Sequence, residues 1–133
     1  YFLVYDVSCR TALTVAREVA GKVKEFGQNA VQLIGPEDQR VSRVAIGTGA
    51  ITPFTNFIDD YHVDLASCTD DGFTYWRDGA FSIDMGIPVI VVNHAVSEVY
   101  GMKLLADHLA DRFSHLPVHF VPQSCIFQLV QAS

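Results

Sequence analysis

One segment constrains the fold of this chain more than any other: "IPVIVVN", residues 87–93, is apolar at almost every position. A strand with one face in water alternates apolar and polar residues, whereas a near-continuous apolar run is typical of a strand in a sheet that is covered on both faces. The segment therefore predicts a central strand in a layered domain of strands and helices.

Strands and helices are predicted to alternate along the rest of the chain. Thr11 can cap a helix whose apolar residues recur at helical spacing as far as Phe26, and Gly27 can end it in a left-handed conformation. Thr52 and Pro53 are suited to the start of a second helix. Further helices are expected over residues 73–85 and from Met102 onward, the last with an inward face of Met102, Leu105, Leu109 and Phe113, and strands over residues 2–5, 30–34, 43–47, 63–67, 87–93, 117–122 and 125–130. We therefore predict an α/β fold, a three-layer sandwich with a mostly parallel central sheet.

Length and composition indicate one globular domain over residues 1–133, half of whose residues are hydrophobic. A net charge of -6 without a cluster of Lys and Arg argues against nucleic acid as a partner. No apolar run approaches the roughly 20 residues of a membrane-spanning helix. Three widely spaced cysteines favour a reducing, cytoplasmic setting. The chain opens on an apolar run without a Met, and we interpret it as a piece of a longer protein.

Three polar loops follow the predicted parallel strands. They contain residues 47–49, 68–71 and 93–98. In open α/β sheets, ligands bind at the carboxyl ends of the strands. The candidate functional residues therefore lie where this architecture places a site.

His94 and Glu98 are the first candidates. Residues four apart share one face of a helix, and imidazole with carboxylate suits zinc, iron, manganese or nickel. Two ligands are too few for tight binding, so further ligands must come from elsewhere. The alternative is that Ser97 caps a helix, Glu98 favours the positive end of that helix, and His94 bonds to the backbone.

Asp70 and Asp71 are the catalytic candidates, because adjacent acids at a strand end can ligate a metal or act as a general base on bound water. The alternative is a turn, for which "TDDG" is favourable. The loop at residues 47–49 is rich in glycine but lacks the Walker and dinucleotide-binding patterns, and a tight crossover explains it equally well. Cys68 has no evident companion base. The remaining histidines share no metal-ligand spacing; they are His62, His108, His115 and His119.

Four segments in this order resemble the C-terminal half of one protein family. They are "RVAIGTGA", "VDLASCTDDGFTYW", "MGIPVIVVNHAVSE" and "MKLLADHLADRF". The family is the NIF-three-like family (Ngg-one-interacting factor three), also known as GTP cyclohydrolase I type 2 homologues or dinuclear-metal-centre proteins. The resemblance covers roughly residues 13–120. It implies that His94 and Glu98, in "NHAVSE", are metal ligands and that the chain is one of two similar halves.

The resemblance also implies a function and an assembly. Family members form ring-shaped homohexamers, and the family label implies a metal-dependent hydrolase acting on a nucleotide-like small molecule. The alternative is a non-enzymatic, metal-binding oligomeric scaffold or regulatory protein, and a third reading is a metal-independent nucleotide-binding domain using residues 47–49. Two departures stand out: "CTDD" replaces the family's "TGE", and Tyr75-Trp76 lacks its histidine. The family's paired histidines and a further aspartate belong to the other half, so this chain would hold half of a dinuclear site.

Overall fold

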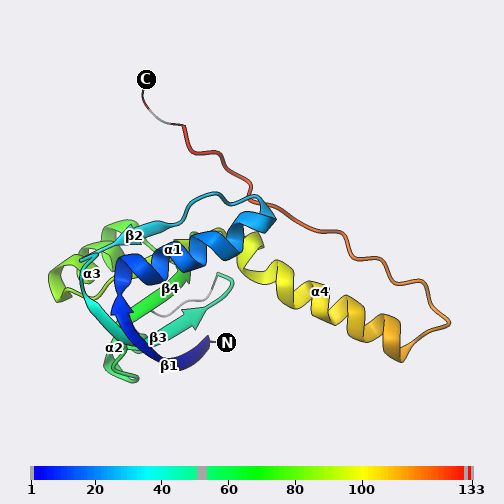
Figure 1. The fold of residues 1–133 in the computed structure, drawn as a ribbon, viewed down its shortest axis with the longest axis horizontal. Coiled ribbons are helices and arrows are strands. Elements are labelled where there is room, and N and C mark those ends of the chain that lie inside the picture. Colours follow the sequence, from blue (N-terminus) through cyan, green and yellow to red (C-terminus); the bar gives the residue numbers. More distant parts are fainter. Residues whose placement is uncertain (1, 51–53, 131, 133) are drawn as a thin grey trace.

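The computed structural model describes residues 2–50, 54–130 and 132. The chain forms an α/β fold in which helices cover both faces of a five-stranded sheet (Figure 1). The strand order is β1-β3-β4-β5-β2. The strands are β1 (Phe2–Thr11), β2 (Gln32–Ile34), β3 (Arg40–Gly47), β4 (Leu65–Thr69) and β5 (Val89–Val92). The three central strands are parallel and both edge strands are antiparallel to their neighbours, so the predicted parallel core is confirmed within a mixed sheet.

Two hydrophobic cores make the sandwich three-layered. On one face of the sheet, α2 (Phe54–Asp59) and α3 (Ala80–Met85) pack through Phe54, Phe57 and Phe81. On the other face, α1 (Ala12–Val23) and the first turns of α4 (His94–Arg112) cover the sheet. Alternate residues of β5 enter opposite cores, which is why this strand is apolar throughout.

The strand register places the loops of interest together. Thr69 and Val92 are partners at the carboxyl ends of β4 and β5. The loops that begin at Asp70 and Asn93 therefore start side by side, and the N–H of Asp70 donates to the carbonyl of Val92 at 3.0 Å. Ligands were expected to bind at these carboxyl ends of the parallel strands.

Local signals for the helix ends are largely confirmed. Thr11 caps α1 by accepting a hydrogen bond from the N–H of Thr14 at 3.3 Å. After a short 3₁₀ turn (Lys24–Phe26), Gly27 adopts a left-handed conformation with φ 81°. Gly86 ends α3 in the same way, with φ 68°. The predicted cap at Thr52 and Pro53 lies outside the described residues.

The helix predicted over residues 73–85 is divided in two. A π-helical turn (Tyr75–Gly79) comes first, and α3 follows it. Within the turn, the buried carboxylate of Asp78 accepts a hydrogen bond from the N–H of Thr74 at 2.8 Å and pairs with Arg77 at 2.7 Å. The carbonyl of Thr74 accepts hydrogen bonds from the N–H groups of Asp78 at 2.7 Å and of Gly79 at 3.4 Å, and the second of these bonds gives the wider π-helical turn.

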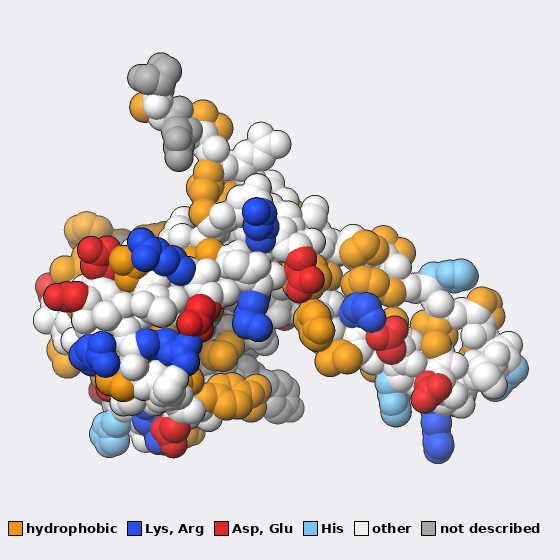
Figure 2. All heavy atoms as spheres, in the orientation of Figure 1, with side chains coloured by type: hydrophobic (Ala, Val, Ile, Leu, Met, Phe, Trp, Pro, Cys, Tyr) orange, Lys and Arg blue, Asp and Glu red, His pale blue; other side chains and the backbone are white. Residues whose placement is uncertain are grey.

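Two predictions for the C-terminal part are wrong. The expected inward face of α4, with Met102, Leu105, Leu109 and Phe113, is 36–55% exposed, and in α4 only Val96 and Val99 are buried. The helix projects from the domain (Figure 1). Apolar side chains lie along the projecting part (Figure 2). The predicted strands 117–122 and 125–130 do not form: the described residues after α4 are irregular, and the Cys125 N–H donates to the Phe26 carbonyl at 3.1 Å. Among the described residues, this backbone hydrogen bond joins the segment to the turn that follows α1 and not to a strand.

Among the helices that the structure describes, none combines the length and the apolar character needed to cross a bilayer.

Candidate metal centre

His94 and Glu98 lie together at the start of α4. His94 is the first residue of this helix and Glu98 follows one turn later, so both side chains share a face, as predicted. The His94 Nε2 and Glu98 Oε2 atoms are 3.2 Å apart. Both side chains are partly exposed, at 36% and 46%, so the pair is accessible from solvent.

Asp71 holds the opposite edge of the His94 ring. Its Oδ2 lies 2.5 Å from His94 Nδ1. This hydrogen bond is the main reason why the pKa of His94 is raised, and Asp71 and Glu98 add electrostatic attraction. Burial raises the pKa of Asp71, but hydrogen bonds with His94 and Thr69 outweigh it and the pKa is lowered. Asp71 is therefore a carboxylate that fixes the orientation of the imidazole.

Asp70 instead bonds the backbone of His94 and the side chain of Asn93 at the start of α4. Its Oδ1 accepts a hydrogen bond from the N–H of His94 at 2.9 Å, and its Oδ2 accepts one from Asn93 Nδ2 at 2.7 Å. The interpretation in which Ser97 caps α4 is wrong, because Ser97 lies inside the helix and its hydroxyl donates to the carbonyl of His94 at 2.7 Å. Asp70 supplies the hydrogen bond at the helix start that Ser97 was expected to make.

The glycine-rich loop after β3 closes over the pair. Thr69 Oγ1 donates to the carbonyl of Gly49 at 2.6 Å, and Gly49 has a left-handed φ of 75°. A Cβ atom at this position would lie 2.8 Å from Glu98 Oε1 and 3.8 Å from His94 Nε2. Only a residue without a side chain allows the backbone to approach the two candidate ligands this closely.

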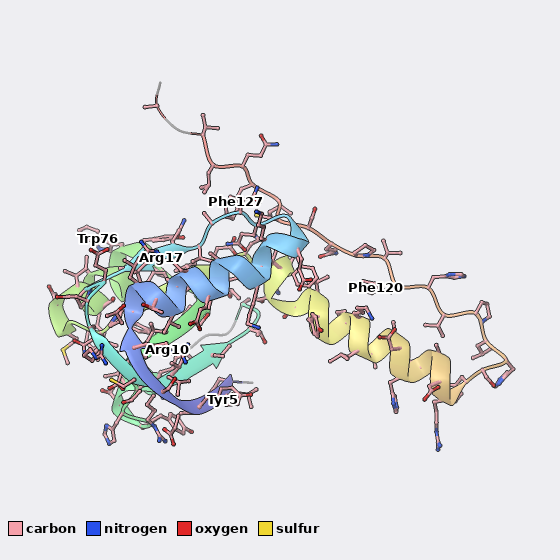
Figure 3. The ribbon with its side chains drawn as sticks, in the orientation of Figure 1. Tyr5, Arg10, Arg17, Trp76, Phe120 and Phe127 are labelled. Carbon is pink, nitrogen blue, oxygen red and sulfur yellow. The ribbon has the colours of Figure 1, made fainter. Side chains whose placement is uncertain are left out.

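The carboxylates of Asp71 and Glu98 and the imidazole of His94 do not converge on one point, because the two carboxylates face different nitrogens of the ring. Within residues 2–50, 54–130 and 132, no group of three or more His, Cys, Asp and Glu side chains is arranged to hold a metal ion. Cys68 is buried, and burial raises its pKa to about 12. Trp76, where the resemblance expects a histidine, is 90% exposed at the end of the domain opposite α4 (Figure 3).

The sequence did not single out two buried residues of this region: Gln28 was not predicted at all, and Asn93 was included only as part of the loop at residues 93–98. Both are buried, and Gln28 Oε1 accepts a hydrogen bond from the N–H of Asn93 at 3.0 Å. Asn93 is recognisable as a polar end to an apolar strand, but no motif marks Gln28, which merely follows the helix-ending Gly27.

Comparisons with known proteins agree with this fold. Three solved structures are similar to the chain: hypothetical protein SA1388 of Staphylococcus aureus (18% identity, TM-score 0.71), a Bacillus cereus protein related to NIF3 (14%, 0.68) and TTHA1606 from Thermus thermophilus (23%, 0.57). The alignments cover 97%, 98% and 84% of this chain but 43%, 34% and 41% of those chains. The chain therefore spans less than half the length of these solved structures, and at such identities the likeness shows the fold alone.

A comparison with curated proteins finds no match. The family described as Duf34/NIF3 (NGG1p interacting factor 3) matches residues 6–125, which is most of the sequence. The match includes both strands that lead into the candidate centre and the helix that carries His94 and Glu98. The chain belongs to the Duf34/NIF3 family.

Proposed function

We propose that this chain contributes two ligands, His94 and Glu98, to a divalent-metal site, and that the complete protein is a metal-dependent hydrolase acting on a nucleotide-like small molecule. The observation that carries the proposal is the approach of His94 Nε2 to Glu98 Oε2, with His94 Nδ1 already engaged by Asp71. A histidine that ligates a metal commonly donates its other N–H to a carboxylate.

The donor atoms fit a metal ion. Two ligand bonds of roughly 2.0–2.1 Å at a tetrahedral angle separate the donor atoms by about 3.3 Å, and the Nε2–Oε2 distance is 3.2 Å. In a neutral imidazole with its proton on Nδ1, donated to Asp71, the Nε2 lone pair faces Glu98. His94 Nε2 and the Glu98 carboxylate would therefore hold the metal ion between them. The missing side chain of Gly49 keeps the space beside Glu98 open.

His94 and Glu98 leave room for further ligands, which the family resemblance assigns to the part of the longer protein outside this chain. Imidazole with carboxylate suits zinc, iron, manganese or nickel. When bound, such an ion lowers the pKa of a coordinated water and polarises the substrate. Asp71 keeps the proton on Nδ1 of His94, and Asp70 fixes the first turn of α4.

The second candidate is a non-enzymatic, metal-binding scaffold or regulatory protein that forms homo-oligomers, such as the hexamer that the resemblance implies. The observation that favours it is the apolar surface of α4, where Met102, Leu104 and Leu105 are 48–57% exposed (Figure 2). Apolar surface of this kind marks an interaction site in many proteins. Both candidates use the same metal ligands and differ in whether the complete protein turns over a substrate.

The test is metal content of the complete protein and its affinity for Zn²⁺, Fe²⁺, Mn²⁺ and Ni²⁺, measured for the wild type, His94→Ala and Glu98→Ala. His108→Ala is the matched control, because His108 is an exposed histidine on the same helix, 14 residues from His94. We expect metal binding to fall sharply in the first two variants and to persist in His108→Ala. Unchanged metal content in His94→Ala and Glu98→Ala would refute the site. Metal-dependent turnover in a panel of nucleotides separates the hydrolase from the scaffold.

A further inference from the structure

We infer that Gln28 is a positioning residue for the candidate metal centre: acting through Asn93 and Asp70, it determines where the first turn of α4, and therefore His94, is held. For its effect on metal binding the inference rests on the proposed function. Its structural part concerns hydrogen bonds of the metal-free chain and is independent of that function.

The N-terminus of α4 is capped in an unusual way. A helix begins with backbone N–H groups that have no partner within the helix, and the side chain of the N-cap residue commonly accepts from one of them. Asn93 occupies this position, but its side chain makes no capping bond. The acceptor is Asp70 Oδ1, which comes from the loop after β4, and Asn93 Nδ2 donates to the second oxygen of Asp70. The start of α4 is therefore fastened to the loop that also carries Asp71.

Gln28 is linked to the N-terminus of α4 through Asn93. The N–H of Asn93 donates to Gln28 Oε1 at 3.0 Å, and Gln28 Nε2 donates to the carbonyl of Ala30 at 3.0 Å. Both polar atoms of the Gln28 amide are engaged, so its orientation is fixed, and Gln28 and Asn93 are each 2% exposed. The segment after α1 thus fixes the backbone position immediately before His94, although 65 residues separate Gln28 from Asn93.

The contacts of the His94 imidazole depend on the position of its backbone. His94 must meet Asp71 through Nδ1 and Glu98 through Nε2, so a shift of its backbone disturbs both contacts. Ligand sites tolerate displacements of only about 0.5 Å. Asn93 Oδ1 is buried without a hydrogen-bond partner in the described part of the chain. Burying an amide oxygen without a hydrogen-bond partner costs free energy, so packing alone does not favour Asn93. The hydrogen bond from Asn93 Nδ2 to Asp70 explains why an asparagine occupies this position.

The experiment replaces Gln28 in the complete protein. Gln28→Met keeps the length and removes both hydrogen bonds, while Gln28→Glu keeps an acceptor for the N–H of Asn93. Gln39→Met is the matched control, because Gln39 is exposed and its side chain, among the described residues, bonds only to the carbonyl of its neighbour Arg40. The readouts are the hydrogen-exchange rate of the His94 amide in the metal-free protein, and the affinity and visible spectrum of bound Co²⁺. A general loss of stability would not change the ligand geometry that the Co²⁺ spectrum reports.

We expect Gln28→Met to raise the His94 exchange rate about tenfold, to weaken Co²⁺ binding roughly 10-fold and to change the spectrum. Gln28→Glu restores part of each effect, and Gln39→Met changes none. If Gln28→Met shows the wild-type exchange rate at the His94 amide and the wild-type affinity for Co²⁺, the inference is overturned. Loss of Co²⁺ binding in His94→Ala would still support the metal site in that case. If the wild type binds no Co²⁺, the proposed function fails, and the exchange rate alone decides the inference. Should Gln28→Met not fold, Gln28→Asn, whose side chain is one methylene shorter than that of Gln28, which bonds Asn93 and Ala30, is measured with the same readouts and decides the inference.

Discussion

Replacing Gly49 with alanine tests whether the loop after β3 controls the position of Glu98. The new Cβ would lie 2.8 Å from Glu98 Oε1, whereas ordinary contacts begin at 3.4 Å, so the carboxylate must move by at least about 0.6 Å. Glu98 is 46% exposed and can rotate into solvent, away from His94. We expect metal affinity to fall roughly 10- to 100-fold, since ligand placement affects affinity on this scale.

The same substitution also strains the backbone, because Gly49 has a φ of 75°. A left-handed alanine costs about 1–2 kcal/mol, which must be separated from the effect on Glu98. Gly86→Ala is the matched control: Gly86 has a φ of 68°, but a Cβ atom added there would have no atom within 4 Å. Urea unfolding should show similar losses for both variants, and titration with Zn²⁺ should show a loss of affinity in Gly49→Ala alone. Equal Zn²⁺ affinity in the two variants would refute the reasoning.

Two further predictions concern Asp64 and the cysteines. Asp64 Oδ2 accepts hydrogen bonds from the N–H and hydroxyl of Ser42 and from the N–H of Arg43; burial raises the pKa of Asp64, but these bonds outweigh it and lower the pKa below its ordinary value. The stability that Asp64 contributes is fully present above its pKa in the unfolded chain and is lost as the pH falls through its lower pKa in the folded chain. Urea unfolding should therefore show that the difference in the free energy of unfolding between wild type and Asp64→Asn decreases from pH 7 to pH 3. A difference that stays constant over this range would contradict the prediction. Cys68 is buried with a pKa of about 12 and Cys9 is exposed; a thiol reagent at pH 8 should label Cys9 in the native protein and Cys68 only after unfolding, as measured by peptide mass spectrometry.

Signals that act over a few residues were sufficient to predict much of the fold. The Thr11 cap, the left-handed Gly27 and Gly86, and the apolar β5 depend on local backbone chemistry or on burial from both sides. The shared face of His94 and Glu98 also follows from helical spacing alone. These features could be predicted because each needs no knowledge of distant contacts.

Features that depend on distant contacts could not be predicted. β1 continues to Thr11, well beyond the expected end, because it pairs with β3 through an irregular register between Asp6 and Arg10. The segments 117–122 and 125–130 have the composition of strands, but a strand also needs a neighbouring edge. The role of Gln28 depends on a hydrogen bond across 65 residues, which no local pattern encodes.

The attachment of α4 has a mechanical consequence. Its 19 residues extend for about 28 Å, yet its buried residues, Val96 and Val99, lie near the end that carries His94 and Glu98. The helix is therefore held at one end: a tilt of about 5° about its first residue would move the far tip by about 2.5 Å and Glu98 by only about 0.5 Å. A displacement of Glu98 by about 0.5 Å would correspond to one about five times larger at the tip. Conversely, a force applied at the tip would act on the candidate ligand Glu98 through an arm about five times longer than the distance from His94 to Glu98.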